Sequence, residues 1–209
     1  MCIRDSMRTG TWRGWGIMQL LGQDVHHAKL GIIGFGRIGR GVARRARGFD
    51  MQVSYHDAVR APQDVEQELG VRFVPLDLLL SESDFVSLHV PLLPQTQHLI
   101  DATALRSMKK TAIIINTSRG PVIDEAALVQ ALRDGVIAGA GLDVYEREPE
   151  LAAGLTELQN VVLLPHIGSA SVATRSKMGE IAAQNVLAFF AGQAPPTALN
   201  PEVLSQRRA

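Results

Sequence analysis

The chain has 209 residues, of which 46% are hydrophobic, and its 21 basic residues balance its 21 acidic ones. This balance gives no electrostatic reason to expect nucleic acid or an anionic membrane as a partner, and no run of about 18 apolar residues predicts a membrane span. The single cysteine, Cys2, excludes an internal disulfide framework and favours a cytoplasmic protein.

The N-terminal stretch precedes the first predicted strand. No helix or strand is predicted for residues 1–6, and they lack the apolar run of a signal peptide. A helix is predicted from Thr11 to Leu21, in which Trp12 and Trp15 pack against a neighbouring lobe or subunit. The polar turn that follows holds two histidines, which we expect to be solvated: His26 and His27.

Strand-like and helix-like segments then alternate along the chain. The predicted strands are residues 30–33, 52–55, 71–74, 84–88, 111–116, 137–142 and 161–164. One predicted helix directly follows the glycine-rich turn. The others span residues 62–69, 76–81, 102–108, 124–133 and 169–190. This alternation predicts an α/β fold, a doubly wound parallel sheet of Rossmann type with flanking helices. Ligands of such sheets bind at the carboxyl ends of the strands.

A G-x-G-x-x-G motif, formed by Gly34, Gly36 and Gly39, joins the first strand to the first helix of this pattern. In such a motif the glycines allow a tight turn, close approach of a pyrophosphate and close packing of helix on strand. Asp57 ends the next strand, 18 residues after Gly39. Its carboxylate can bind a ribose diol and would repel a 2′-phosphate, so the pattern predicts NAD rather than NADP. A purely structural glycine turn is the alternative.

Two later strand ends carry a proline-rich loop and an arginine. Pro91 and Pro94 predict a rigid loop that could form a wall beside a cofactor. For His89, at the start of this loop, a packed or hydrogen-bonded side chain is favoured over a ligand role. Arg119 follows the buried strand 111–116, and a guanidinium there suits bidentate binding of a carboxylate. A surface salt bridge is the alternative for Arg119.

The last two strand ends carry acids and a histidine. Asp143 could bind a carboxamide or a ribose, and Glu148 lies in the following loop, although each alone is an ordinary solvated acid. His166 follows a Val- and Leu-rich strand, and a histidine so placed can act as acid or base near neutral pH. An arginine, a glutamate and a histidine at the edge of a dinucleotide-binding sheet suggest reduction of a carbonyl next to a carboxylate.

With these motifs the chain resembles the D-isomer-specific 2-hydroxyacid dehydrogenases, and most closely their glyoxylate/hydroxypyruvate reductase branch. The resemblance rests on residues 31–40, 88–96, 108–132, 139–149 and 165–170, which include Asn-Thr-Ser-Arg-Gly-Pro-Val-Ile-Asp-Glu and His-Ile-Gly-Ser-Ala. It implies that Arg119 binds the substrate carboxylate and carbonyl, and that Glu148 pairs with His166, the acid/base. It also implies cofactor contacts at Gly34, Gly36, Arg37, Ile38, Gly39, Asp57, Val90, Pro91, Thr96, Thr117, Ser118, Asp143, His166 and Gly168. No metal site is expected. Ala58 stands where NADP-tolerant relatives often place arginine, which again favours NAD.

The resemblance also implies a substrate-binding domain of on the order of 100 residues ahead of Thr11, whose closure excludes water and completes the site. We therefore expect a cofactor-domain fragment with three parts: a tail and connecting helix at residues 1–28, a dinucleotide-binding domain at 29–168, and a long helix and tail at 169–209. Members of the family are usually dimeric, so a homodimer through the region from Thr11 to Leu21 is expected, with a small 2-oxo or 2-hydroxy acid as substrate.

Three functions remain open at this point. The first is NADH-dependent reduction of glyoxylate or hydroxypyruvate to the D-2-hydroxy acid. The second is a non-catalytic NAD-binding module, either truncated or acting like a corepressor of the same fold. The third keeps the fold but changes the substrate to formate or phosphite. Glu148 argues against formate, because formate enzymes of this family pair the histidine with glutamine, whereas phosphite enzymes keep the glutamate.

Overall fold

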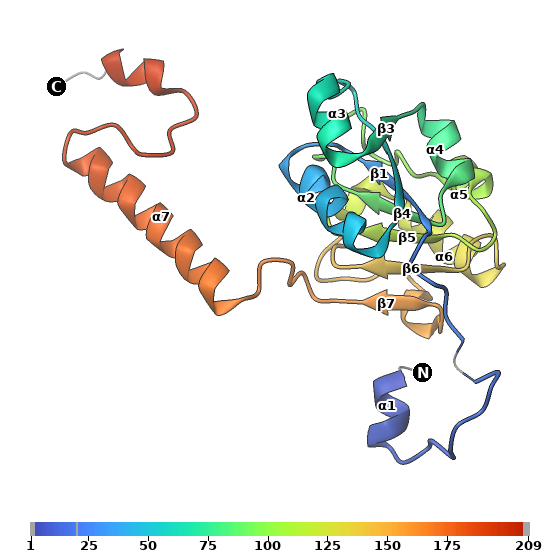
Figure 1. Cartoon of the computed structure of the whole chain (residues 1–209). Coiled ribbons are helices and arrows are strands. Elements are labelled where there is room, and N and C mark those ends of the chain that lie inside the picture. The colour runs from blue at the N-terminus through green and yellow to red at the C-terminus, as the bar shows by residue number, and fades with distance from the viewer. Residues whose placement is uncertain (1–2, 20, 207–209) are drawn as a thin grey trace. The chain divides into compact units, whose positions relative to one another are not determined.

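The computed structural model describes residues 3–19 and 21–206 (Figure 1). The chain divides into two compact units, Met1–His166 and Ile167–Ala209. The strands are β1 Lys29–Ile33, β2 Gln52–His56, β3 Val71–Phe73, β4 Phe85–Leu88, β5 Ile113–Asn116, β6 Gly139–Leu142 and β7 Val161–Leu163. The α-helices are α1 Ile3–Arg8, α2 Arg37–Ala46, α3 Gln63–Leu69, α4 Leu76–Glu82, α5 Ala102–Ser107, α6 Glu125–Arg133 and α7 Val172–Phe190. Short 3-10 helices are η1 Arg47–Phe49, η2 Gly120–Val122, η3 Leu155–Glu157 and η4 Pro201–Gln206.

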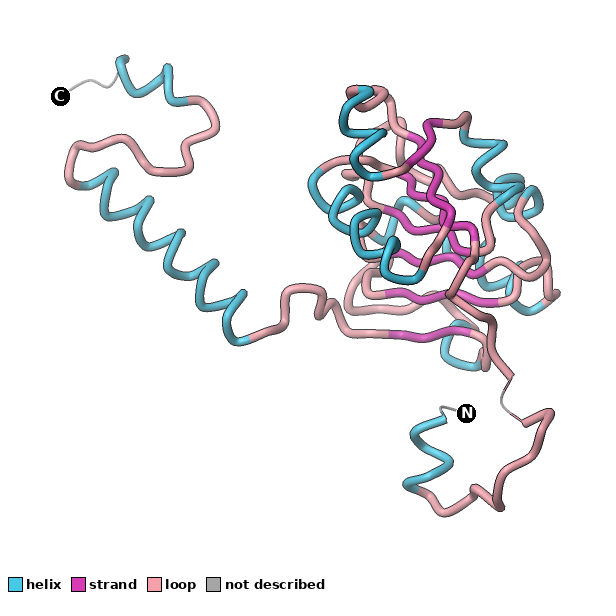
Figure 2. The backbone as a smooth tube through the Cα atoms, viewed as in Figure 1, coloured by secondary structure: helices cyan, strands magenta, loops and turns pink. Residues whose placement is uncertain are grey.

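The first unit contains a seven-stranded sheet with the order β3-β2-β1-β4-β5-β6-β7, in which every neighbouring pair is parallel (Figure 2). The strand order reverses at β1, which lies between β2 and β4. Ligands of open parallel sheets bind outside the carboxyl ends of the strands at such a reversal. The predicted doubly wound α/β fold is confirmed.

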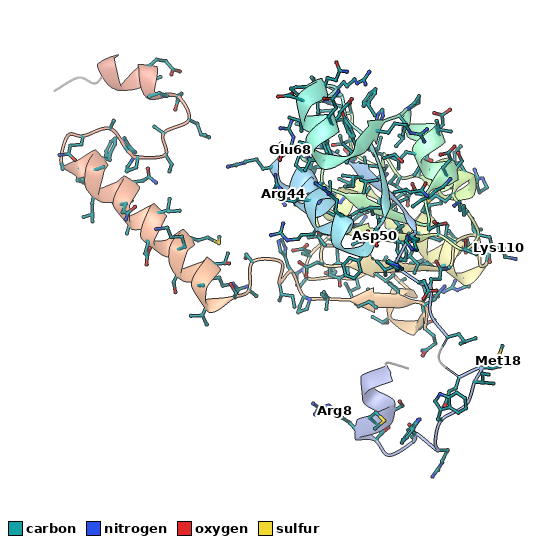
Figure 3. All side chains as sticks on the ribbon, viewed as in Figure 1. Arg8, Met18, Arg44, Asp50, Glu68 and Lys110 are labelled. Carbon is teal, nitrogen blue, oxygen red and sulfur yellow. The ribbon has the colours of Figure 1, made fainter. Side chains whose placement is uncertain are left out.

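Two hydrophobic clusters lie on the two faces of the sheet. Leu30 and Ile32 of β1 belong to the cluster that includes Ala43 of α2 and Leu69 of α3. Ile33, one residue further along β1, belongs to the larger cluster, which contains buried residues of α4, α5 and α6. Because successive side chains of a strand point to opposite faces, this alternation places helices on both faces of the sheet. The outer residues of these helices, such as Arg44 and Glu68, are exposed (Figure 3).

Most predicted elements agree with the structure to within one or two residues at each end. The helix predicted from Thr11 to Leu21 is wrong: residues 11–16 have no regular structure, residues 17–19 form a turn, and Leu20 lies outside the described residues. The helix of this region is instead α1, within a stretch for which no element was predicted. The backbone at Gly10 and Gly14 has φ values of +67° and +124°, which an α-helix cannot contain.

The second unit contains α7, the short stretch that precedes it from Ile167, and the segment that follows it. Ser171 caps α7, since its hydroxyl accepts the Thr174 amide at 3.1 Å. The side-chain amide of Asn185 holds the later segment, exchanging two hydrogen bonds with Thr197. The predicted apolar face of the helix is present but solvated, with Met178 57% and Phe189 46% exposed. Within the described residues, no helix is long and apolar enough to cross a membrane.

Candidate active site at the carboxyl edge of the sheet

The last residues of six strands form one line across the sheet. Strand pairing aligns Ile33 with His56 and Leu88, and then continues through Asn116, Leu142 and Leu163. Residues that follow the strands therefore lie along a single edge. The first residues after these strands are Gly34, Asp57, His89, Thr117, Asp143 and Leu164, and the predicted site residues lie among them or shortly after them.

The glycine-rich turn after β1 is shaped by backbone contacts. Gly34 has φ +93°, and an added Cβ there would lie 2.6 Å from the carbonyl carbon of His89. A Cβ on Gly39 would lie 2.2 Å from the carbonyl oxygen of Gly34, so only glycine lets α2 pack this closely on the turn. Around Gly36, by contrast, a Cβ would meet nothing within 4 Å, and the neighbouring Arg37 and Ile38 are exposed at the helix start.

Asp57 fixes this turn from the neighbouring strand. Its Oδ2 accepts the Phe35 amide at 2.5 Å, while its Oδ1 accepts the Val59 amide at 3.4 Å. The Phe35 ring stacks on Tyr55, with 3.9 Å between ring centroids, and so holds the turn against β2. A carboxylate has about four acceptor positions. Asp57 therefore keeps acceptor capacity for a diol, and the free N–H groups at the start of α2 fit a pyrophosphate.

The loop after β4 is closed by hydrogen bonds of one threonine. The Thr96 hydroxyl lies 2.7 Å from the Pro91 carbonyl oxygen and also accepts the Leu93 amide at 2.8 Å. Val90 is half-buried beside this loop. His89 lies 2.9 Å from the Ser87 hydroxyl through Nε2, and burial lowers the pKa of its ring. The interpretation of His89 as a hydrogen-bonded, packed histidine is confirmed.

Buried Asn116 shapes the loop that carries Arg119. Its side-chain oxygen accepts the amide and hydroxyl of Ser118 at 3.0 and 2.9 Å, and its amide nitrogen donates to the Arg119 carbonyl at 2.9 Å. Arg119 itself is exposed, and its Nη1 donates to the Ser118 carbonyl at 2.6 Å. Thr117 is also exposed.

The loops after β5 and β6 touch through their backbones. A Cβ on Gly120 would lie 1.9 Å from the carbonyl carbon of Tyr145, so no other residue can occupy this position without moving a loop. Asp143 directly follows β6 and is a buried acid, and its amide donates to the Asn116 carbonyl at 3.0 Å. The Arg119 loop and the Glu148 loop are therefore held together without a side chain between them.

Glu148 and His166 form the predicted pair. His166 Nδ1 lies 2.8 Å from Glu148 Oε2, and Glu148 Oε1 accepts the Tyr145 amide at 3.0 Å. The hydrogen bond from His166 is the main cause that holds the pKa of Glu148 below its usual value, with the Tyr145 amide second and the charge of Arg119 adding to it. Since a carboxylate only accepts, Nδ1 carries the proton of this bond and Nε2 remains for chemistry.

A cavity of about 350 Å³ lies against this pair. Its walls include Tyr145, Leu151 and Leu164 beside Glu148 and His166. The lining is mainly apolar with a few convergent polar groups, which is the usual character of a small-molecule site.

Two residues that shape this site had no predicted role, Asn116 and Tyr145. The Tyr145 hydroxyl donates to the Leu164 carbonyl at 2.8 Å, while its amide binds Glu148, so one residue ties the β6 and β7 ends together. The role of Asn116 could have been predicted, because it is a polar residue directly after the apolar run Ile113–Ile115. The role of Tyr145 could not, because its hydrogen-bond partner is a backbone carbonyl 19 residues away. Gly168 lies in the second unit and is described only there.

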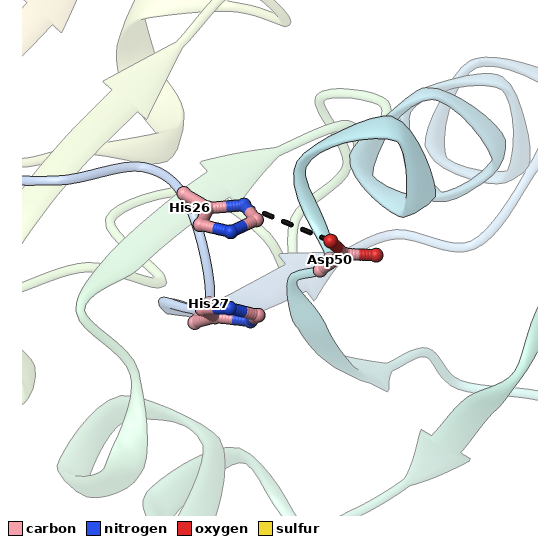
Figure 4. A group of neighbouring side chains, drawn as sticks. All are labelled: His26, His27 and Asp50. Atoms are coloured by element: carbon pink, nitrogen blue, oxygen red, sulfur yellow. Dashed lines mark ion pairs between the residues drawn. The ribbon is translucent and has the colours of Figure 1, made fainter.

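A separate cluster lies before β1 and β2, away from the carboxyl edge. His26, His27 and Asp50 are exposed, and among the described residues they are the group whose geometry could hold a metal ion (Figure 4). His26 Nδ1 lies 3.0 Å from the Phe49 carbonyl and 3.8 Å from Asp50 Oδ2. A carbonyl only accepts, so this nitrogen carries a proton and has no lone pair for a metal. The two histidines are solvated, as predicted.

The amino-acid sequence is similar to those of known proteins. The profile described as "D-isomer specific 2-hydroxyacid dehydrogenase, NAD binding domain" matches residues 1–168. The chain is 54% identical over 203 residues to a glyoxylate reductase of Korarchaeum cryptofilum, covering 96% of this chain and 61% of the relative. It is 52% identical over 206 residues to a glyoxylate reductase of Thermococcus onnurineus, covering 97% and 61%.

A solved structure gives the same result. The structure of a glyoxylate reductase from Paecilomyes thermophila matches with a TM-score of 0.81 and 42% identity, over 88% of this chain and 55% of that chain. The fold and the matched sequence define an NAD-binding domain, and the chain belongs to the D-isomer specific 2-hydroxyacid dehydrogenase family. Among relatives, it is similar to glyoxylate reductases and spans about 61% of the length of those it matches.

Proposed function

We propose that the chain forms the cofactor-binding and acid/base part of an NAD(H)-dependent oxidoreductase. The enzyme would interconvert glyoxylate or hydroxypyruvate and the corresponding D-2-hydroxy acid. The observation that carries this proposal is the 2.8 Å contact between His166 and Glu148, beside the loop of Arg119. A binding module without catalysis needs no such pair. The sequence identity of 54% and 52% to two glyoxylate reductases supports the proposed substrate class.

His166 is the proposed acid/base. Its Nδ1–H is fixed by Glu148, which orients the ring and leaves Nε2 as the nitrogen that exchanges protons. During reduction the protonated ring gives a proton to the substrate carbonyl oxygen as negative charge develops there. In the reverse direction the neutral ring removes the hydroxyl proton. Glu148 stabilises the imidazolium in both directions because its carboxylate stays ionised at neutral pH.

Arg119 is the proposed substrate-binding residue. Its guanidinium is exposed at the carboxyl edge, and although Nη1 donates to the Ser118 carbonyl, its other N–H groups can donate two parallel hydrogen bonds to a carboxylate. Asn116 fixes the backbone on either side of Ser118, so the base of this side chain is preorganised. The positive charge also attracts anionic 2-oxo acids to the site.

The cofactor would be held by the glycine turn and by Asp57. The open space at Gly36 and the start of α2 fit the pyrophosphate, and the remaining acceptor positions of Asp57 fit the adenosine ribose. We expect NAD rather than NADP because Asp57 would repel a 2′-phosphate. The proposed contacts within the first unit also include Val90, Pro91, Thr96, Thr117, Ser118 and Asp143. When bound, the nicotinamide supplies the hydride that reduces the carbonyl carbon.

The first test is a calorimetric titration of the 209-residue chain with NADH and, in parallel, with NADPH. We expect binding of NADH and much weaker binding of NADPH. Absence of NADH binding, in a chain shown to be folded by circular dichroism, would contradict the cofactor assignment.

The second test is turnover by a longer chain that carries a family substrate-binding domain ahead of Thr11. We expect NADH oxidation with glyoxylate or hydroxypyruvate, and phosphite with NAD serves as the competing substrate. A longer chain that binds NADH but turns over none of these acids would favour the non-catalytic module. The same chain allows the predicted homodimer to be tested by analytical ultracentrifugation, with Trp12→Ala and Trp15→Ala as the weakened variants.

A further inference from the structure

Glu125, at the start of α6, is a buried acid whose carboxylate binds a backbone amide of the loop after β6. Its Oε1 accepts the Glu146 amide at 2.7 Å, and the nearby Ala152 amide also favours its ionised form. The residue is only 4% exposed. Burial raises the pKa of Glu125, while these hydrogen bonds oppose that change. Such an acid is costly to bury unless its partners are fixed in place.

The side chain of Glu146 in turn binds the start of α6. Its Oε1 accepts the Glu125 amide at 3.1 Å, one of the helix N–H groups that have no partner within the helix. The same oxygen lies 2.8 Å from His98 Nε2, which donates to it. Two acids this close would repel each other, but the shared N–H groups and the positive end of α6 favour negative charge there.

These contacts bracket the residue that pairs with His166. Glu125 holds the loop at Glu146, two residues before Glu148, and its carboxylate also faces the Ala152 amide, four residues after it. Between these points Glu148 reaches His166 and the Tyr145 amide. On the preceding side the loop lies against Gly120, where the backbones touch. The position of Glu148 is therefore set from α6, which itself carries no proposed catalytic group.

We propose that Glu125 is a positioning residue for the Glu148–His166 pair, and that it acts by holding the loop of residues 146–152 to the start of α6. This inference rests on the proposed function, because positioning matters for catalysis only if Glu148 and His166 are the acid/base pair. Whether Glu125 fixes the position of Glu148 can be measured without turnover.

The test uses Glu125→Gln in the 209-residue chain. Glutamine keeps the shape but removes the charge, so the Glu146 amide loses a bond to a charged acceptor. By NMR, we expect hydrogen exchange at the Glu146 amide to become about 10- to 100-fold faster, the usual worth of a hydrogen bond to a charged group. We also expect the pKa of the Glu148 carboxyl, followed through its carbon shift, to rise toward the ordinary value as its contact with His166 loosens.

The matched control is Glu150→Gln, the same chemical change at an exposed position in the same loop. We expect it to leave both readouts unchanged. If Glu125→Gln does not fold, Glu125→Asp replaces it, because the shorter side chain keeps the charge but withdraws the carboxylate from the Glu146 amide. The same two readouts are expected to shift in the same direction.

Two outcomes overturn the inference. In a folded Glu125→Gln chain, faster exchange with an unchanged pKa of Glu148 would make Glu125 a structural residue only. Equal changes in Glu150→Gln would show an effect of loop charge rather than of Glu125. A shift in Glu148 combined with an inactive longer chain would contradict the proposed function and leave the positioning role intact.

Discussion

The two halves of the carboxyl edge are built by different means. At β1 and β2 the site is shaped by backbone: glycines at 34 and 39 leave no room for a Cβ, and one Asp57 contact fixes the turn. At β5, β6 and β7 it is shaped by side chains that bind backbone, namely Asn116, Tyr145 and Glu148. The first half should therefore be damaged by added atoms, and the second by removed hydrogen-bond partners.

The largest expected effect lies in the second half. In the longer chain, His166→Ala should lower kcat by about 10²- to 10⁴-fold, the usual contribution of general acid–base catalysis. NADH affinity should change little, because the first half of the edge is untouched. Stopped-flow kinetics and NADH titration measure the two quantities. A large loss of NADH binding would mean that His166 is mainly structural.

The first half is tested by two glycines that differ in their surroundings. Gly39→Ala places a Cβ 2.2 Å from a backbone oxygen and should cost about 1–3 kcal/mol of folding free energy. Gly36→Ala meets open space and should cost about 0.5 kcal/mol, yet it should weaken NADH binding by obstructing the pyrophosphate. Urea unfolding and calorimetry separate these effects. Equal stability losses in the two variants would remove the steric distinction.

Asn116→Ala removes a side chain that serves three partners. The Ser118 amide and the Arg119 carbonyl lose their partners, and we expect a loss of about 1–3 kcal/mol in the free energy of unfolding. Because the Arg119 loop loosens, KM for the 2-oxo acid in the longer chain should rise more than kcat falls. An unchanged KM would separate this loop from substrate binding.

Asp57→Ser tests the one side chain on which the first half depends. We expect NADH affinity to fall about tenfold, since a charged acceptor is lost, and NADPH to improve relative to NADH. Thermal unfolding of the same variant measures the loss of the Phe35 contact. If the NADH/NADPH ratio stays constant, Asp57 is not the ribose-binding acid.

The smallest expected effect concerns the packing behind the first half. Glu66 accepts hydrogen bonds from Arg60 and from the Tyr55 hydroxyl, and these lower its pKa from 4.5 to about 2. Its ionised form therefore stabilises the fold above about pH 4.5, and the contribution is lost as the pH falls toward 2. Glu66→Gln should flatten the stability–pH curve in this range, as followed by circular dichroism. An unaltered curve would assign acid unfolding to other groups.

The fold and the positions of the candidate residues were accessible from sequence because both depend on local pattern. β-Branched runs ending in glycine or polar residues located the strands, and parallel pairing then aligned their ends. The Glu148–His166 contact joins residues that are 18 positions apart in the sequence. Spacing alone could not predict this contact, and it was predicted from the resemblance to a known family. Asn116 was recognisable in the sequence because a polar residue follows directly after an apolar run.

Other features were out of reach because they depend on distant backbone. Glu125 reads as an ordinary first-turn acid of a helix, and only the fold shows the Glu146 amide against it. The helix predicted from Thr11 to Leu21 failed because apolar spacing was given more weight than the glycines at 10 and 14. In α7 the pattern gave the helix correctly, although it begins at Val172 rather than at residue 169.

The strand order has a consequence for how such enzymes can diversify. The strands β1, β2 and β3 come from one unbroken stretch, residues 29–73, which holds the proposed ribose-binding Asp57, whereas the proposed acid/base pair lies within residues 85–166. Under the proposed function, a change at Asp57 would alter the preferred dinucleotide while the Glu148–His166 pair keeps its geometry. Cofactor preference and proton transfer would then be able to evolve separately on this sheet.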